Sequence, residues 1–229
     1  MAVVDAERVN RGKAPGLVFQ DGGRLPPPPR WPPDGNGDRS PEADAGRSLS
    51  NARLGMLMLM GGESMFFGGL VAAFLNLRLS ASVWPPPLQP RLPVGLTAVN
   101  TLVLLASSLS LVWALRAFRA ADRRRLVRGL VRTAGLGALF LVVQGVEWVR
   151  LVHFGLTVAS GAYGATFYTL IGVHGVHVLG AVTWLALVLV AAAGGRYTPE
   201  RHVGLVACAM YWHFVVGLWP ILYLLVYLV

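Results

Sequence analysis

The chain has 229 residues, of which 55% are hydrophobic and 14% charged, and its mean hydropathy is +0.56. This composition excludes an ordinary soluble domain and predicts a protein that crosses a membrane several times. The net charge of +9 belongs to residues 51–229, because the first 50 residues hold seven basic and seven acidic side chains. Basic residues in a membrane protein usually mark its cytoplasmic loops, so we expect the charge to report topology and not nucleic-acid binding.

Residues 1–50 are rich in proline and in mixed charge and poor in aliphatic side chains. Such a segment buries too little apolar surface to offset the entropy that it would lose on ordering. We therefore expect a disordered, proline-rich tail over residues 1–50, followed by one transmembrane domain over residues 51–229. No basic stretch with a short apolar core opens the chain, so we do not expect a cleaved signal peptide.

Five apolar runs follow the tail, and each has roughly 22 to 28 residues, which is enough to cross a bilayer with some tilt. Backbone groups in lipid have to be paired within their own segment, so the runs are predicted to be helices and the fold class all-α. The runs cover approximately residues 53–79, 93–118, 132–154, 166–193 and 202–229.

The connection between the second and third runs is strongly basic. It carries seven arginines: Arg116, Arg119, Arg123, Arg124, Arg125, Arg128 and Arg132. The positive-inside rule places this connection in the cytoplasm. With five spans, the N-terminus is then inside and the C-terminal Val229 outside. Arg196 and Arg201 agree with this orientation, because the fourth connection should also be cytoplasmic.

Glu63 lies near the middle of the first run, where an unpaired carboxylate would be costly. Its neighbours Met65, Phe66 and Phe67 are apolar and exclude water locally. We therefore expect a neutral carboxyl group at pH 7 that faces the interior of the helix bundle or an interface with another subunit. A structural role and a role in proton handling are both open for this residue.

The third and fourth runs carry the other candidate groups of the membrane interior. Glu147 follows Gln144 by one helical turn, and His174 and His177 lie three residues apart on one helix face. At ~1.5 Å per residue, Glu147 and His174 come to a similar depth, so we expect them to be hydrogen-bonded, directly or through one water, with His177 as the alternative partner. Neutral histidines that are hydrogen-bonded between helices are the structural alternative to a ligand or proton-handling role.

The fifth run adds Tyr211 and His213, while His202 lies at its start near the inner surface. We expect His213 to share a layer with the acids and histidines of the other runs. Bis-histidine haem needs opposed residues on facing helices; the depths of His202 and His174 do not match, whereas His177 with His213 is geometrically possible. The aromatic neighbours of His213 favour packing, so we expect no metal site in this chain.

Six segments, taken in their order and spacing, carry a resemblance to a known family. They are Gly62-Glu63-Ser64-Met65-Phe66-Phe67, Trp84-Pro85-Pro86, Gln144-Gly145-Val146-Glu147-Trp148, Tyr163-Gly164-Ala165-Thr166-Phe167-Tyr168, Gly172-Val173-His174-Gly175-Val176-His177, and His202-Val203-Gly204 leading to Tyr211-Trp212-His213-Phe214-Val215. Over about Leu54 to Val229 the chain resembles subunit III of the haem-copper terminal oxidases, the cytochrome c oxidase subunit III family.

The resemblance implies a short, five-helix form that lacks the first two helices of the seven-helix version. It implies a non-catalytic subunit of aerobic respiration that stabilises subunit I, supports proton uptake and binds phospholipid, with subunit II as a further partner. Haems and copper are expected in subunit I, so no cofactor and no catalytic residue are expected in this chain. The resemblance also implies a multi-pass protein of a bacterial-type inner cell membrane.

Two positions connect this chain to the chemistry of the family. Glu63 occupies the position of the family's membrane carboxylate, which reacts with carbodiimides. The family motif continues after Val215 into an aspartate, whereas this chain has Val216. That departure leaves open a related subunit of a quinol oxidase or of a nitric oxide reductase. A self-sufficient haem- or metal-binding membrane protein is the alternative from a different class.

Overall fold

The computed structural model describes residues 41–86, 92–198 and 201–228, with side chains from Asn51 onward. Within this part the chain forms five α-helices, a final π-helical turn and no strand. The elements are α1 (Pro41–Ser80), α2 (Val94–Arg119), α3 (Arg123–His153), α4 (Gly161–Ala193), α5 (Val203–Tyr223) and η1 (Leu224–Leu228). All five helices are long and apolar enough to cross a membrane, which confirms the predicted all-α polytopic fold.

The first helix begins before the first apolar run. The predicted tail over residues 1–40 lies outside the described residues, but residues 41–50, which were also assigned to the tail, belong to α1. This segment contains glutamate, alanine, arginine and leucine, which are good helix formers. A helix that has been nucleated gains a hydrogen bond with each residue added, so α1 continues outward beyond its membrane-spanning part.

The arginine-rich connection is much shorter than predicted. Because α3 begins at Arg123, only residues 120–122 join it to α2, and all seven of the arginines belong to the two helices. Asp122 caps α3, since its Oδ1 accepts a hydrogen bond of 2.9 Å from the backbone N–H of Arg125. Arginine forms helices well and can extend its charged end back to the membrane surface, so a hydropathy criterion places such residues in a loop by mistake.

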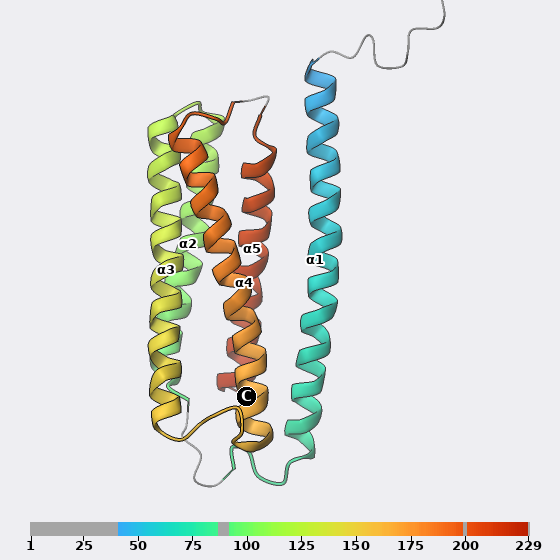
Figure 1. Ribbon diagram of the computed structural model, residues 1–229, viewed down its shortest axis with the longest axis vertical. Helices are drawn as coiled ribbons and strands as arrows, with labels where there is room; N and C mark the ends of the chain where they lie inside the picture. The colour runs from blue at the N-terminus through green and yellow to red at the C-terminus, as the bar shows by residue number, and fades with distance from the viewer. Residues whose placement is uncertain (1–40, 87–91, 199–200, 229) are drawn as a thin grey trace, which may run out of the picture. The chain divides into compact units, whose positions relative to one another are not determined.

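Helices α2 to α5 form a bundle, and α1 packs on α5 and α4 (Figure 1). The most extensive pairing is between α2 and α3, where a Cβ at Gly129 would lie only 2.6 Å from Cβ of Ala114. Small residues at such a contact let two helix backbones approach closely in a membrane. Helix α1 is the least buried of the five, and large apolar side chains such as Met58 and Met65 are exposed on it.

Two tryptophans of α5 form the centre of the core. Trp212 and Trp219 are almost completely buried. The indole N–H of Trp212 donates to Oγ of Ser107 at 3.3 Å, and that of Trp219 donates to Oγ1 of Thr101 at 2.8 Å. Both hydroxyl groups belong to α2, so α5 and α2 are held together by apolar packing and by satisfied polar ends of the two rings.

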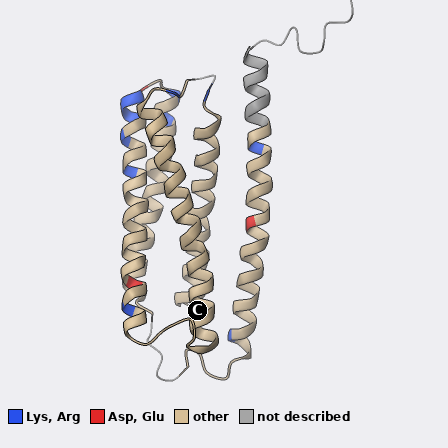
Figure 2. Ribbon diagram, in the orientation of Figure 1, with Lys and Arg blue, Asp and Glu red and all other residues tan. Residues whose placement is uncertain are grey.

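Apart from Arg150, the arginines of α2 and α3 gather at the end of the bundle that also holds the α4–α5 connection (Figure 2). Arg78 and Arg150 lie in the last turns of α1 and α3, at the opposite end. We predict that the arginine-rich end is cytoplasmic, because basic residues are concentrated on that side of membrane proteins. The test uses a fluorescent protein that matures only in the cytoplasm. Fused after Val229, it should stay dark. The same protein fused after Ala121 should fluoresce, and fluorescence of the Val229 fusion would contradict the predicted orientation.

Candidate functional site

Glu63 of α1 and His177 of α4 form a pair between two helices. Nε2 of His177 lies 2.9 Å from Oε2 of Glu63, and the two side chains are 19% and 21% exposed, respectively. The ring of Phe67 meets the imidazole edge-on, with centroids 5.1 Å apart. Glu63 therefore faces the neighbouring helix α4, as expected for a carboxyl group inside a membrane span, and its partner is the histidine that had been considered for Glu147.

The other nitrogen of His177 fixes where the hydrogens lie. Nδ1 is 2.7 Å from the carbonyl oxygen of Val173, and a carbonyl oxygen can only accept, so Nδ1 carries a hydrogen. Nε2 then either donates to a carboxylate of Glu63 or accepts from its carboxylic acid. In both forms one proton lies between the two side chains and the pair has no net charge. A pair without net charge is tolerated in a membrane span far better than an isolated ion.

The Glu63–His177 pair borders a groove on the surface of the chain. The groove is lined by Met58, Leu59, Gly62, Glu63, Phe66 and His177. Its walls are mostly apolar, and the two polar side chains lie at one place in it. The pair can thus be reached from outside this chain while its immediate surroundings remain those of a membrane interior.

Glu147 lies in a separate, fully buried network that joins α2, α3 and η1. Its Oε2 accepts from the hydroxyl of Thr97 at 2.9 Å, and its Oε1 accepts from the hydroxyl of Tyr227 at 2.7 Å. The amide nitrogen of Gln144 donates to the same Tyr227 oxygen at 3.3 Å. Gln144 lies one turn before Glu147 in α3, as its spacing predicts, whereas Thr97 and Tyr227 are partners that were not predicted from the sequence.

A direct hydrogen bond between Glu147 and His174, the first form of the prediction, is wrong. His174 is completely buried and stacks on Trp219, with ring centroids 5.0 Å apart, and no described residue is hydrogen-bonded to either of its ring nitrogens. A separation of three residues turns a helix by about 300°, so two such side chains diverge by about 60°. His174 therefore points into the core, while His177 points toward α1.

The remaining candidates have local partners of their own. Nδ1 of His213 lies 2.6 Å from Oγ of Ser108 on α2. The ring of Tyr211 contacts that of Trp184, and the ring of His202 contacts that of Phe118 near the ends of α5 and α2. Across the described residues, no three histidine, cysteine, aspartate or glutamate side chains are grouped as a metal site requires. The polar layer predicted across four helices is thus divided into separate contacts.

Val216, at the position where the family motif has an aspartate, is buried in the apolar core. Its neighbours in the core include Trp212 and Trp219. At this position the chain has an apolar side chain that completes the packing of α5.

Comparison with known proteins gives one consistent result. The family model for cytochrome c oxidase subunit III matches residues 45–229. The chain is 34% identical over 181 residues to cytochrome c oxidase subunit 3 of Sus scrofa, a match that covers 76% of this chain and 68% of the relative. The corresponding protein of Pelomedusa subrufa is 34% identical over 184 residues, covering 78% and 69% of the two chains. That of Cyprinus carpio is 35% identical over 181 residues, covering 76% and 68%.

Proposed function

The chain belongs to the cytochrome c oxidase subunit III family, and from this premise we propose that it is the non-catalytic subunit III of a haem-copper terminal oxidase in aerobic respiration. In this role it stabilises subunit I and supports the uptake of protons by the complex. The Glu63–His177 pair is the observation that carries the proposal.

A shared proton at a surface groove is what a proton-uptake role requires. The Glu63–His177 pair holds one proton between its two side chains, while the hydrogen on Nδ1 of His177 is held separately by the carbonyl of Val173. One member of the pair, Glu63, lies on α1, the least buried of the five helices. Protein and lipid surfaces beside α1 therefore come close to the pair, as a role in a larger complex needs.

The proposal places the redox chemistry outside this chain. Haems and copper are assigned to subunit I, and subunit II is a further partner. The relatives are named as subunits of cytochrome c oxidase, and we propose cytochrome c as the electron donor of this complex as well. We further propose that the chain binds phospholipid and that it is a subunit of a bacterial-type inner cell membrane.

The test is purification of the full, affinity-tagged chain from its own membranes under mild conditions. We expect it to bring down a haem-copper subunit I, and the complex should consume oxygen when supplied with reduced cytochrome c. A complex that accepts electrons only from a quinol, or that reduces nitric oxide and not oxygen, would contradict the proposed donor or acceptor. Recovery of the tagged chain alone with a histidine-ligated haem spectrum would overturn the proposal and favour a self-sufficient haem protein.

A further inference from the structure

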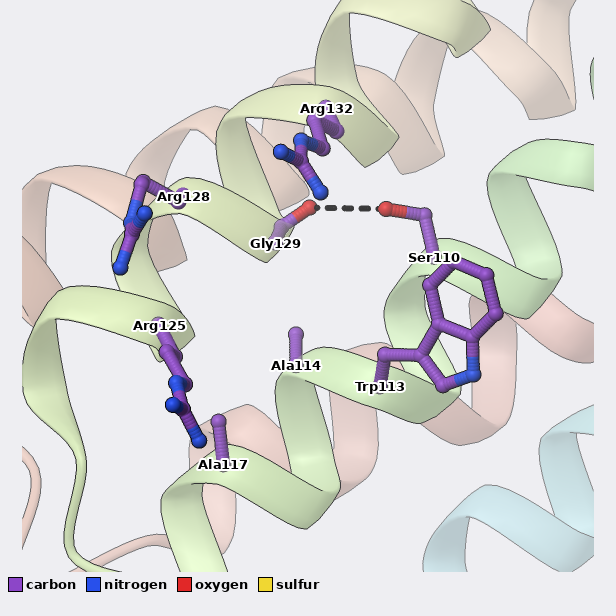
Figure 3. Close-up of a pocket in the computed structure, with 8 residues that line it drawn as sticks. All are labelled: Ser110, Trp113, Ala114, Ala117, Arg125, Arg128, Gly129 and Arg132. Atoms are coloured by element: carbon purple, nitrogen blue, oxygen red, sulfur yellow. Dashed lines mark hydrogen bonds between the residues drawn. The ribbon is translucent and has the colours of Figure 1, made fainter.

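A second groove lies between α2 and α3 at the arginine-rich end of the bundle (Figure 3). Its volume is about 270 Å³, and its α3 side presents Arg125, Arg128 and Arg132. These positions are three and four residues apart, so the three side chains share one face of α3. In Figure 3 the guanidinium groups lie along that side of the groove, with Trp113 and small residues of α2 opposite.

The floor of this groove is built from small side chains. Ala114 and Ala117 of α2 are buried and occupy little space, and Gly129 of α3 has no side chain at all. Oγ of Ser110 donates to the carbonyl oxygen of Gly129 at 3.3 Å and so ties the two helices together at the deeper end. The closeness of the two backbones at Gly129 and Ala114 leaves a fixed cleft between the arginines and Trp113.

The positive charge of the groove is only partly compensated. Arg125 forms an ion pair with Asp122, in which Nε and Oδ2 are 3.1 Å apart. Arg128 makes one hydrogen bond, to the backbone oxygen of Arg124, and Arg132 has no hydrogen bond or ion pair to any described residue. The groove therefore presents two guanidinium groups without a counter-charge, and guanidinium groups bind phosphate oxygens well.

The depth of the arginines points to a ligand that belongs to the membrane. Arg132 follows the start of α3 by nine residues, which places its Cα ~14 Å along the helix from that end. The 31 residues of α3 span ~46 Å, about 16 Å more than the hydrocarbon of a bilayer, so Arg132 lies within reach of the headgroup layer, where lipid phosphates are found. Trp113, which is more than half exposed at the mouth of the groove, is a residue type that favours the membrane interface.

We propose that this groove binds the phosphate of an anionic phospholipid, with Arg128 and Arg132 as its main ligands and the acyl chains running down the outer face of α2 and α3. Exposed apolar residues continue along that face, including Leu109 and Leu139. The site deepens the proposed function by giving phospholipid binding a location. The proposed site rests on the proposed function in one respect, which is that the chain lies in a membrane. The experiment that tests the site does not need the oxidase complex.

The experiment is a lipid titration of the full chain in detergent, followed by native mass spectrometry. Phosphatidylglycerol should bind at least tenfold more tightly than phosphatidylcholine. Arg132→Gln and Arg128→Gln should each weaken phosphatidylglycerol binding about fivefold, because each basic group near an anionic headgroup contributes about that factor, and the double variant should lose about 25-fold. Arg125 is not substituted, because it forms an ion pair with Asp122, and a change there could disturb the cap that Asp122 provides for α3.

A matched control separates a site from general surface attraction. Arg124 is exposed in the same turn of α3 but does not line the groove, so Arg124→Gln should bind phosphatidylglycerol as the wild type does. Ala117→Leu keeps every charge but fills the groove, so it should also lose the preference for phosphatidylglycerol over phosphatidylcholine. Unchanged melting temperatures without lipid would show that the variants are folded.

Three results would overturn the proposal. An equal loss in Arg124→Gln and Arg132→Gln would mean diffuse attraction to the basic end of the bundle. Stabilisation of the lipid-free chain by inorganic phosphate, as strong as that by phosphatidylglycerol and lost in Arg132→Gln, would mean a site for a soluble anion. No preference for phosphatidylglycerol, together with cross-linking of Arg128 or Arg132 to an acidic segment of another subunit in the intact complex, would mean that a protein occupies the groove.

Discussion

Replacement of Glu147 by leucine is expected to lower the free energy of unfolding of the chain by about 1–3 kcal/mol, the usual cost of a buried donor that is left without an acceptor. That donor is the hydroxyl of Tyr227, which lies 2.7 Å from Oε1 of Glu147 and is buried with it. The loss of the acceptor for Thr97 costs less free energy, because the hydroxyl of Thr97 can donate to the carbonyl oxygen of Pro93 instead, 3.0 Å away. Unfolding of the full chain in mixed micelles with a denaturing detergent measures the loss.

The comparison that makes this result specific is a double-mutant cycle. Glu147→Gln keeps an oxygen that can accept from Tyr227, so it should lose less than Glu147→Leu. Tyr227→Phe removes the donor, and in that background Glu147→Leu should cost clearly less than it does alone. If the two losses simply add, the hydrogen bond between Tyr227 and Glu147 does not contribute to stability and the network is wrongly described.

The number and type of the helices could be predicted from the sequence because the bilayer restricts the choices so strongly. An apolar run of sufficient length in lipid has to be a helix, and five runs therefore give five spans. The helix ends could not be predicted in the same way. At α3 the hydropathy criterion excluded Arg123 to Arg128, although Asp122 caps the helix there and arginine side chains can reach back to the surface.

The candidate site could be predicted in its residues but not in its pairing. The cost of a polar group in lipid draws attention to Glu63, Glu147 and the histidines wherever they occur in a span. Depth along a helix follows from residue number, whereas the rotation of a helix about its axis depends on what packs around it. His177 therefore pairs with Glu63 of α1, which is far from it in sequence, and not with a residue of the preceding helix α3.

Thr97 and Tyr227 were missed for a related reason. Hydroxyl groups are common in membrane helices and carry no charge, so they give little signal in a sequence. Tyr227 also lies in η1, the π-helical turn after α5, where residue spacing no longer follows the α-helical period. One feature of the sequence could have indicated these partners. A buried acid without a histidine partner needs hydroxyl or amide donors, and Gln144 alone supplies too few donors for the two oxygens of Glu147.

Variants of the Glu63–His177 pair are expected to have the largest effect on the assembled oxidase. Glu63→Gln should keep assembly and most of the activity, because the amide N–H can still donate to Nε2 of His177, as the neutral acid does. Glu63→Leu and His177→Leu should each lower the yield of this chain bound to subunit I several-fold, since each leaves one polar group in an apolar setting without its partner. Quantitative mass spectrometry of the purified complex measures the ratio of the two subunits.

The double variant Glu63→Leu/His177→Leu separates packing from proton handling. It leaves neither polar group unpaired, so it should assemble better than either single variant, because replacement of both partners by apolar groups is close to neutral. It also removes the shared proton, so the assembled complex, reconstituted in vesicles, should take up protons more slowly than the wild type and than Glu63→Gln, which keeps the imidazole of His177. If the assembled double variant takes up protons at the wild-type rate, the pair serves only to join α1 to α4, and the proton-uptake part of the proposed function is overturned. If instead the double variant assembles no better than the single variants, the contact seen between Nε2 and Oε2 is not what holds α1 in place.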